Sequence, residues 1–180
     1  FLSLVLFAAL LLVAAGLGVE RQARRELENE LTRRLHAVGG AAESALGPGI
    51  VPALVRLGPA QAESPFYRDR RAVLLQLKER TGVRRIFLAD TTGRSFVDTD
   101  PRVAIGAPMT QLRSDRVEMA AVRAGRAAAA ALFTDESGEP RKTGYVPVRQ
   151  DGRVIALIGV EADATFLRAA RALRARILGI

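Results

Sequence analysis

The first residues of the chain form an unbroken apolar segment. Residues 1–18 (FLSLVLFAALLLVAAGLG) contain no charged residue and no proline. A helix rises 1.5 Å per residue, so this segment would extend about 27 Å, close to the thickness of a bilayer core. We therefore expect a transmembrane helix over 1–18. The alternative is a signal peptide, for which Ala15-Gly16-Leu17-Gly18 offers a loose cleavage site.

The next segment, 19–46, is charged around a narrow apolar stripe. The stripe recurs at intervals of three or four residues and consists of Leu27, Leu31, Leu35, Val38, Ala42 and Ala45. This spacing is typical of a helix and is close to a heptad repeat. The helix can pack on its own domain, or it can be a membrane-proximal helix that pairs with a second copy of the chain. Different parts of one helix can serve both purposes.

The pattern over 47–162 predicts one α+β domain. Gly47-Pro48-Gly49 ends the long helix, because proline cannot continue it and glycine supplies the turn. Helices are expected at 66–80 and at 115–124, the second with Asp115 and Glu118 as a capping box. Strands are expected at 84–89, 94–98, 128–134, 141–149 and 153–160. The short connections between successive strands favour a five-stranded antiparallel sheet with helices packed against it.

The last segment, 163–180, reads as a helix that Asp163 caps. It has no acidic residue from Thr165 onward, and its arginines alternate with an apolar stripe. We expect it to lead into a second, truncated membrane span, since arginines just before a span can contact lipid head groups. A solvated amphipathic helix is the alternative.

Composition argues against several classes of chemistry. The chain has 180 residues, a net charge of +8 and no cysteine, which excludes disulfides and thiolate metal sites. His36 is the only histidine and lacks the partners of a triad or a zinc site. Asp90, Asp98 and Asp100 lie at expected turns, where aspartate serves local hydrogen bonding, so we expect no metal or acid–base role for them. We therefore expect no catalytic residue, metal or cofactor in this fragment.

Nucleic-acid binding is not expected either. The basic runs at 68–71 and 84–85 have few interleaved aromatic residues, and a membrane span separates the domain from DNA. No glycine-rich phosphate loop precedes a helix, so we expect no nucleotide-binding site either.

Two stretches resemble a known family. Residues 86–96 (IFLADTTGRSF) resemble the "strand, Asp-x-x-Gly, strand" opening of single-Cache (PAS-like) extracytoplasmic sensor domains. Later, 144–148 (GYVPV), Asp151-Gly152 and 154–160 resemble the last two strands of that family. The resemblance covers roughly 20–180, including the long helix that leaves the membrane.

The resemblance implies a function and a location. Such domains are the input halves of histidine kinases, chemoreceptors and cyclic-dinucleotide enzymes, and they bind small molecules, often amino acids or carboxylates. The domain would then face the periplasm or cell exterior from the inner membrane, as part of a receptor, in the first place a sensor histidine kinase. We expect this receptor to be a homodimer that pairs through the stripe from Leu27 to Ala45. Dicarboxylate-sensing members carry Arg-x-aromatic-x-Pro-Val in the fourth strand. Here Thr143 stands where that arginine would be, with Lys142 beside it, which counts against a dicarboxylate.

The ligand would lie between the sheet and the loop and helix that cross it. Strand alternation puts Thr143 and Tyr145 on one face of their strand, and Phe96 with Asp98 on one face of another. Aromatic rings would form the walls, Asp98 would receive an amine, and Thr143 or Lys142 a carboxylate. The candidate ligand-binding residues are Phe96, Asp98, Phe133, Lys142, Thr143 and Tyr145. The alternative is that the aromatic residues belong to the core and that Asp98 is a turn residue.

Two other functions compete with ligand sensing. A membrane-anchored structural or adaptor protein would need no small-molecule pocket. A membrane-anchored hydrolase would need a nucleophile, a base and an orienting group, and we find no such set.

Overall fold

The structure is a computed structural model. It describes the backbone of residues 2–47, 49–135 and 137–164, and side chains within these ranges from Arg21 onward. A single antiparallel sheet lies at its centre, in the order β2-β1-β6-β5-β3, and β4 also pairs with β5. The strands are β1 (Arg85–Ala89), β2 (Ser95–Asp98), β3 (Ala128–Ala129), β4 (Phe133–Thr134), β5 (Pro140–Gln150) and β6 (Arg153–Asp163).

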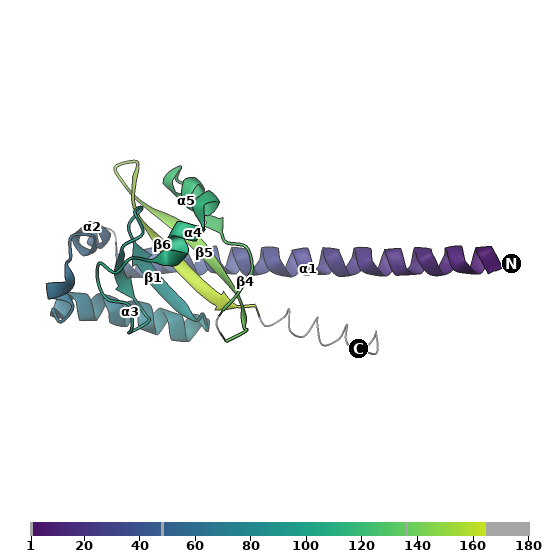
Figure 1. Ribbon diagram of the computed structural model, residues 1–180. Helices are drawn as coiled ribbons and strands as arrows, with labels where there is room; N and C mark the ends of the chain where they lie inside the picture. Colours follow the sequence, from purple (N-terminus) through teal and green to yellow (C-terminus); the bar gives the residue numbers. More distant parts are fainter. Residues whose placement is uncertain (1, 48, 136, 165–180) are drawn as a thin grey trace.

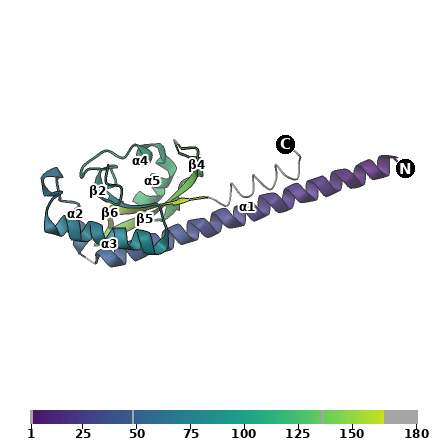
Figure 2. The ribbon, with the colours of Figure 1, turned by 90° about the horizontal axis from the view of Figure 1, so that it is seen from below.

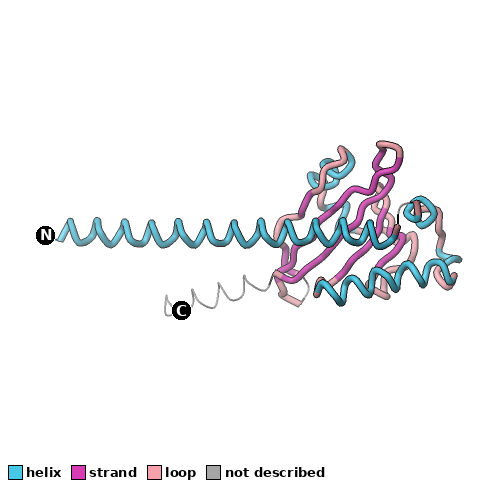
Figure 3. The backbone as a smooth tube through the Cα atoms, turned by 180° about the vertical axis from the view of Figure 1, so that it is seen from behind, coloured by secondary structure: helices cyan, strands magenta, loops and turns pink. Residues whose placement is uncertain are grey.

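Helices cover both faces of the sheet. The helices are α1 (Leu2–Leu46), α2 (Ile50–Leu54), α3 (Pro65–Thr81), α4 (Thr110–Ser114) and α5 (Arg116–Arg123), with a 3₁₀ turn at Pro59–Gln61. Helices α1 and α3 lie side by side on one face, while α4 and α5 lie on the other (Figures 1 and 2). The N-terminal part of α1 extends far beyond the sheet (Figure 3). The expected α+β fold is confirmed.

The C-terminal half of α1 packs on the sheet of its own domain. Leu31, Leu35, Val38 and Ala42 of the expected stripe are buried in the core, whereas Leu27 is 46% exposed. Glycines bring α1 close to β5. A Cβ atom added at Gly39 would lie 2.5 Å from Cγ2 of Val146, and one at Gly144 would lie 2.7 Å from Cβ of Leu35. Most of the stripe is thus part of the monomer core.

The ends of α3 follow from local chemistry. The Ser64 hydroxyl accepts a hydrogen bond from the backbone N–H of Tyr67, and Pro65 occupies the first helical position. Gly82 ends the helix in the left-handed conformation, with φ at 65°. The helix expected at 66–80 is therefore confirmed, with one more residue at each end.

The strand expected at 128–134 is in fact two short strands. Ala129 pairs with Gly144, and Phe133 pairs with Arg141. The segment from β3 to β4 therefore advances by four residues while β5 advances by three, so it carries one extra residue. The extra residue interrupts the ladder, as a bulge does, and yields six strands instead of five.

The capping box expected at the start of α5 is wrong. Asp115 precedes the helix but makes no side-chain cap, and its carboxylate accepts a hydrogen bond from Tyr145 instead. The loop expected before this helix also contains the short helix α4, which sequence periodicity did not predict.

Among the residues whose side chains the structure describes, no helix is both long and apolar enough to cross a membrane. The span expected at 1–18 and the helix expected after Asp163 fall mainly outside those residues.

Candidate functional site

The face of the sheet under α4 and α5 carries its own apolar cluster. Its buried members are Phe87, Ala89, Met109, Leu112, Met119, Val122, Ala130, Tyr145 and Leu157. The rings of Phe87 and Tyr145 meet edge-to-face, with their centroids 6.5 Å apart. Phe87 lies over β6 at Gly159, where a Cβ would be 2.0 Å from the ring. We call this packed contact between the sheet face and α4–α5 the α4–α5 layer.

Two hydrogen bonds cross this layer from β5. The Tyr145 hydroxyl donates to Oδ2 of Asp115 at 2.5 Å, and Nε2 of Gln111 donates to the Thr143 hydroxyl at 2.7 Å. Tyr145 and Thr143 are fully buried. An apolar layer with a few convergent polar groups is the usual composition of a small-molecule site.

Burial changes the pKa values of Tyr145 and Asp115, which form the first of these hydrogen bonds. Burial raises the pKa of Tyr145, and the hydrogen bond to the Asp115 carboxylate raises it further. Burial also raises the pKa of Asp115, against the opposing effect of the Tyr145 hydrogen bond. The phenol therefore remains a neutral donor at any physiological pH.

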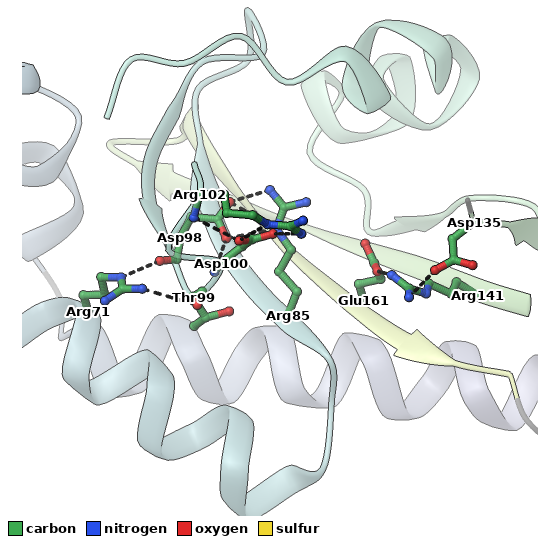
Figure 4. A network of polar contacts seen from close by, with 9 residues as sticks. All are labelled: Arg71, Arg85, Asp98, Thr99, Asp100, Arg102, Asp135, Arg141 and Glu161. Carbon is green, nitrogen blue, oxygen red and sulfur yellow. Dashed lines mark hydrogen bonds and ion pairs between the residues drawn. The ribbon is translucent and has the colours of Figure 1, made fainter. Parts of the chain in front are cut away.

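Buried ion pairs lie further along the same face of the sheet (Figure 4). Arg141 bonds Oε1 of Glu161 at 2.9 Å and also pairs with Asp135. Glu161 lies opposite Arg85 in the pairing of β1 with β6. Arg85 in turn holds the carboxylate of Asp98, with Nη2 at 2.5 Å from Oδ2.

Asp98 is fully engaged within the fold. Besides Arg85, its carboxylate accepts a hydrogen bond from the backbone N–H of Asp100, and its carbonyl accepts one from Nε of Arg71 on α3 (Figure 4). Burial raises the pKa of Asp98, although the hydrogen bond from Arg85 opposes this shift. An incoming amine would have to displace Arg85 to reach the carboxylate.

The structure brings together only some of the residues predicted to bind ligand. Tyr145 and Thr143 line the α4–α5 layer, and Asp98 lies on the same face of the sheet. Lys142 is buried, and strand alternation puts it on the α1 face instead.

The two remaining predicted residues lie elsewhere. Phe96 falls in a bulge of β2, between the residues that pair with Leu88 and Ala89, and belongs to the apolar cluster of α1 and α3. Phe133 is half-buried in β4 at the margin of the sheet.

Several residues of this face were not predicted. They are Phe87, Gln111, Asp115, Arg141 and Glu161. Arg141 precedes Thr143 by two positions, so strand alternation was a sufficient signal for it. Gln111 and Asp115 lie on short elements whose position only the tertiary structure defines.

The described residues offer no metal site. No group of three or more histidine, cysteine or acidic side chains lies together in the part of the chain with described side chains. The chemistry available on this face is hydrogen bonding and ion pairing to a small polar molecule.

Comparison with known proteins supports the fold. No protein-family profile matches the chain, and no curated protein sequence matches it either. Among solved structures, the sensor domain of Escherichia coli DcuS is similar, with 15% identity and a TM-score of 0.57, covering 83% of this chain and 98% of that domain.

The sensory domain of the Campylobacter jejuni chemoreceptor Tlp3 is also similar. The structure with isoleucine bound has 10% identity and a TM-score of 0.51, covering 84% of this chain and 58% of that domain. The structure with L-valine has 11% identity, a TM-score of 0.50 and the same 58% coverage. The chain thus spans less than two thirds of the Tlp3 sensory domain but nearly all of the DcuS sensor domain. The chain therefore has the fold of the DcuS and Tlp3 sensor domains.

Proposed function

We propose that this chain is the extracytoplasmic ligand-sensing domain of a transmembrane receptor. Residues 1–18 would form the first membrane span, and 163–180 would lead into a second. The fold shared with receptor sensor domains supports this role. The observation that carries it is the pair of hydrogen bonds from Tyr145 and Thr143 to Asp115 and Gln111, which lie within an otherwise apolar layer.

The proposed ligand is a small molecule with an amino or carboxylate group. Met109, Leu112 and Met119 are at most 5% exposed, so they would have to move to admit a ligand. Methionine is well suited to this, because its unbranched side chain adapts to irregular spaces. A carboxylate would accept from Thr143 and Gln111, and an amine would replace the Tyr145 hydroxyl as the donor to Asp115.

Ligand binding on this face has a direct route to α1. The ligand would compete for the bonds that tie β5 to α4–α5, and β5 is the strand against which α1 packs at Gly39 and Gly144. A ligand with different affinity for two arrangements of these elements would shift their populations, and α1 would carry the shift toward the membrane.

The complete receptor is proposed to be a homodimeric sensor histidine kinase of the inner membrane. Leu31, Leu35, Val38 and Ala42 are occupied by the core, so pairing of α1 between copies would use the part of the helix near Leu27, which is 46% exposed. The output domain would lie beyond residue 180.

The proposal is tested by ligand-induced stabilisation. The chain, purified in detergent micelles, is heated with single amino acids and carboxylates. A ligand at one hundred times its dissociation constant stabilises a protein by about 2.7 kcal/mol, a readily measured shift in melting temperature. We expect Gln111→Ala to reduce the shift, and Gln76→Ala, at an exposed position of α3, to leave it unchanged. An adaptor without a ligand would give no shift with any compound.

A further inference from the structure

A band of exposed arginines runs along the outer side of α4 and α5. It consists of Arg94, Arg113, Arg116, Arg123, Arg149 and Arg153, all of which are exposed. They come from the β1–β2 turn, α4, α5 and the β5–β6 hairpin, which are far apart in sequence. We call this set the arginine band.

Three adjoining surface hollows connect the band. One is lined by Arg123, Arg149 and Arg153, a second by Arg113, Arg116 and Arg123, and a third by Arg94 and Arg113. Thr91 and Arg123 line both the first and the second hollow, and Arg113 lines both the second and the third. No acidic residue lines any of the three. The hollows therefore form one continuous basic track.

The arginines of the band are not neutralised by ion pairs with described residues. Within the described part of the chain, none of its six arginines forms an ion pair. The nearby Asp90 carboxylate accepts from the backbone of Thr92 and Arg94, and Asp115 accepts from Tyr145, so both are used within the fold. With Glu118 and Asp151, four carboxylates lie next to the band in sequence, so its six positive charges outnumber the negative ones. Such a cluster repels itself and attracts anions.

Two of the guanidinium groups are held in place by the backbone. Nη2 of Arg123 donates to the carbonyl of Thr91 at 3.1 Å, and Nη2 of Arg149 donates to the carbonyl of Gly125 at 2.6 Å. A guanidinium has five N–H donors, so each retains donors that can bind an anion in the first hollow. Groups already fixed in position lose less entropy on binding.

From this arrangement we propose that the arginine band binds a linear polyanion, a polymer with anionic groups repeated along its length. A single phosphate or carboxylate would occupy one hollow, whereas the shared walls favour a ligand that passes through all three. The N-terminal part of α1 extends far beyond the sheet and the helices that cover it (Figures 1 and 2), so α4 and α5 lie away from the end of α1 that would enter the membrane, which favours a free polymer over lipid head groups. This site lies on the outer side of α4 and α5, whereas the proposed ligand site lies on their inner side; Leu112 and Met119 contribute to both.

The test uses the full chain and inorganic polyphosphate as the probe. Binding to long-chain polyphosphate, tripolyphosphate and orthophosphate is measured at several salt concentrations, with a polyuronate as the carboxylate polymer. Arg113→Gln/Arg116→Gln/Arg123→Gln removes the centre of the band. The matched control, Arg68→Gln/Arg80→Gln/Arg84→Gln, removes three exposed arginines from α3 and the segment after it. A second variant, Arg94→Gln/Arg149→Gln/Arg153→Gln, removes the two ends of the band.

We expect long polyphosphate to bind more tightly than tripolyphosphate. Either band variant should weaken its binding by about tenfold or more and reduce the dependence on salt, because fewer counterions are released on binding. The control should change affinity by less than about twofold on the same reasoning. Tighter binding of the polyuronate would identify carboxylates as the anionic groups and would also support the proposal. Equal losses in control and band variants, or tripolyphosphate binding as tightly as the long chain, would overturn it.

Discussion

The Tyr145 hydroxyl donates a hydrogen bond to Oδ2 of Asp115 at 2.5 Å, and this bond joins the long strand β5 to the residue before α5. Tyr145 also lies in the apolar cluster of the α4–α5 layer, with its ring against Phe87. The bond therefore joins α5, which covers the proposed ligand site, to strand β5, on which the site lies. Several consequences of this arrangement can be measured.

Tyr145→Phe removes the bond while keeping the ring. We expect a loss of about 1–3 kcal/mol in the free energy of unfolding, because the partly buried Asp115 carboxylate loses its donor. Chemical denaturation measures this change. Tyr67→Phe is the matched control, since Tyr67 is also buried but its hydroxyl forms no hydrogen bond with a described residue. A larger loss for the control would contradict this account of Tyr145.

The raised pKa of Asp115 predicts a pH dependence of stability. Because the pKa in the folded state lies above the ordinary 3.8, the folded protein binds the proton more tightly than the unfolded chain. The contribution of Asp115 is thus complete below about pH 3.8 and is lost as pH rises through the folded-state pKa. The difference in unfolding free energy between the native chain and Asp115→Asn should fall with rising pH. A difference that grows with pH would contradict the predicted direction.

Removing only one partner of the Arg141–Glu161 ion pair should lower the free energy of unfolding. The two side chains are 12% and 7% exposed, so Arg141→Met leaves the Glu161 charge buried without its partner. We expect a loss of about 3–5 kcal/mol. Adding Glu161→Leu should restore part of it, because the buried Glu161 charge is then gone, while Asp135 still lacks its arginine partner. Arg33→Met, in a solvent-exposed pair with Glu30, serves as the control and should have no measurable effect.

The contact of α1 with β5 predicts opposite effects of one substitution at adjacent glycines. A Cβ at Gly39 would lie 2.5 Å from Val146, whereas one at Gly40 would meet nothing within 4 Å. We expect Gly39→Ala to destabilise the domain by about 1–3 kcal/mol through overpacking. Gly40→Ala should stabilise it by up to about 1 kcal/mol, because alanine favours the helix. Thermal unfolding of both variants checks the contact, and equal effects would contradict it.

The sequence was sufficient for the fold class but not for the composition of the site. Alternation in β5 correctly puts Thr143 and Tyr145 on one face, because β5 pairs with β6 without a register shift from Arg141 to Val148. It fails at Phe96, since a bulge in β2 changes the side to which the residue points. Gln111 and Asp115 escaped prediction because α4 has five residues, too few for a periodic pattern. The spacing of Asp115 from Glu118 fits a capping box as well as it fits a bond to a distant strand, so the sequence alone does not distinguish the two.

The most direct test of the central claim is calorimetric titration of the chain with the amino acid or carboxylate that raises its melting temperature most. The native chain should bind it at one site, Thr143→Val and Tyr145→Phe should each weaken binding, and the arginine-band variants should bind it with unchanged affinity. If no amino acid or carboxylate raises the melting temperature, or if one binds equally well to Thr143→Val and Tyr145→Phe, the α4–α5 layer is not the ligand site.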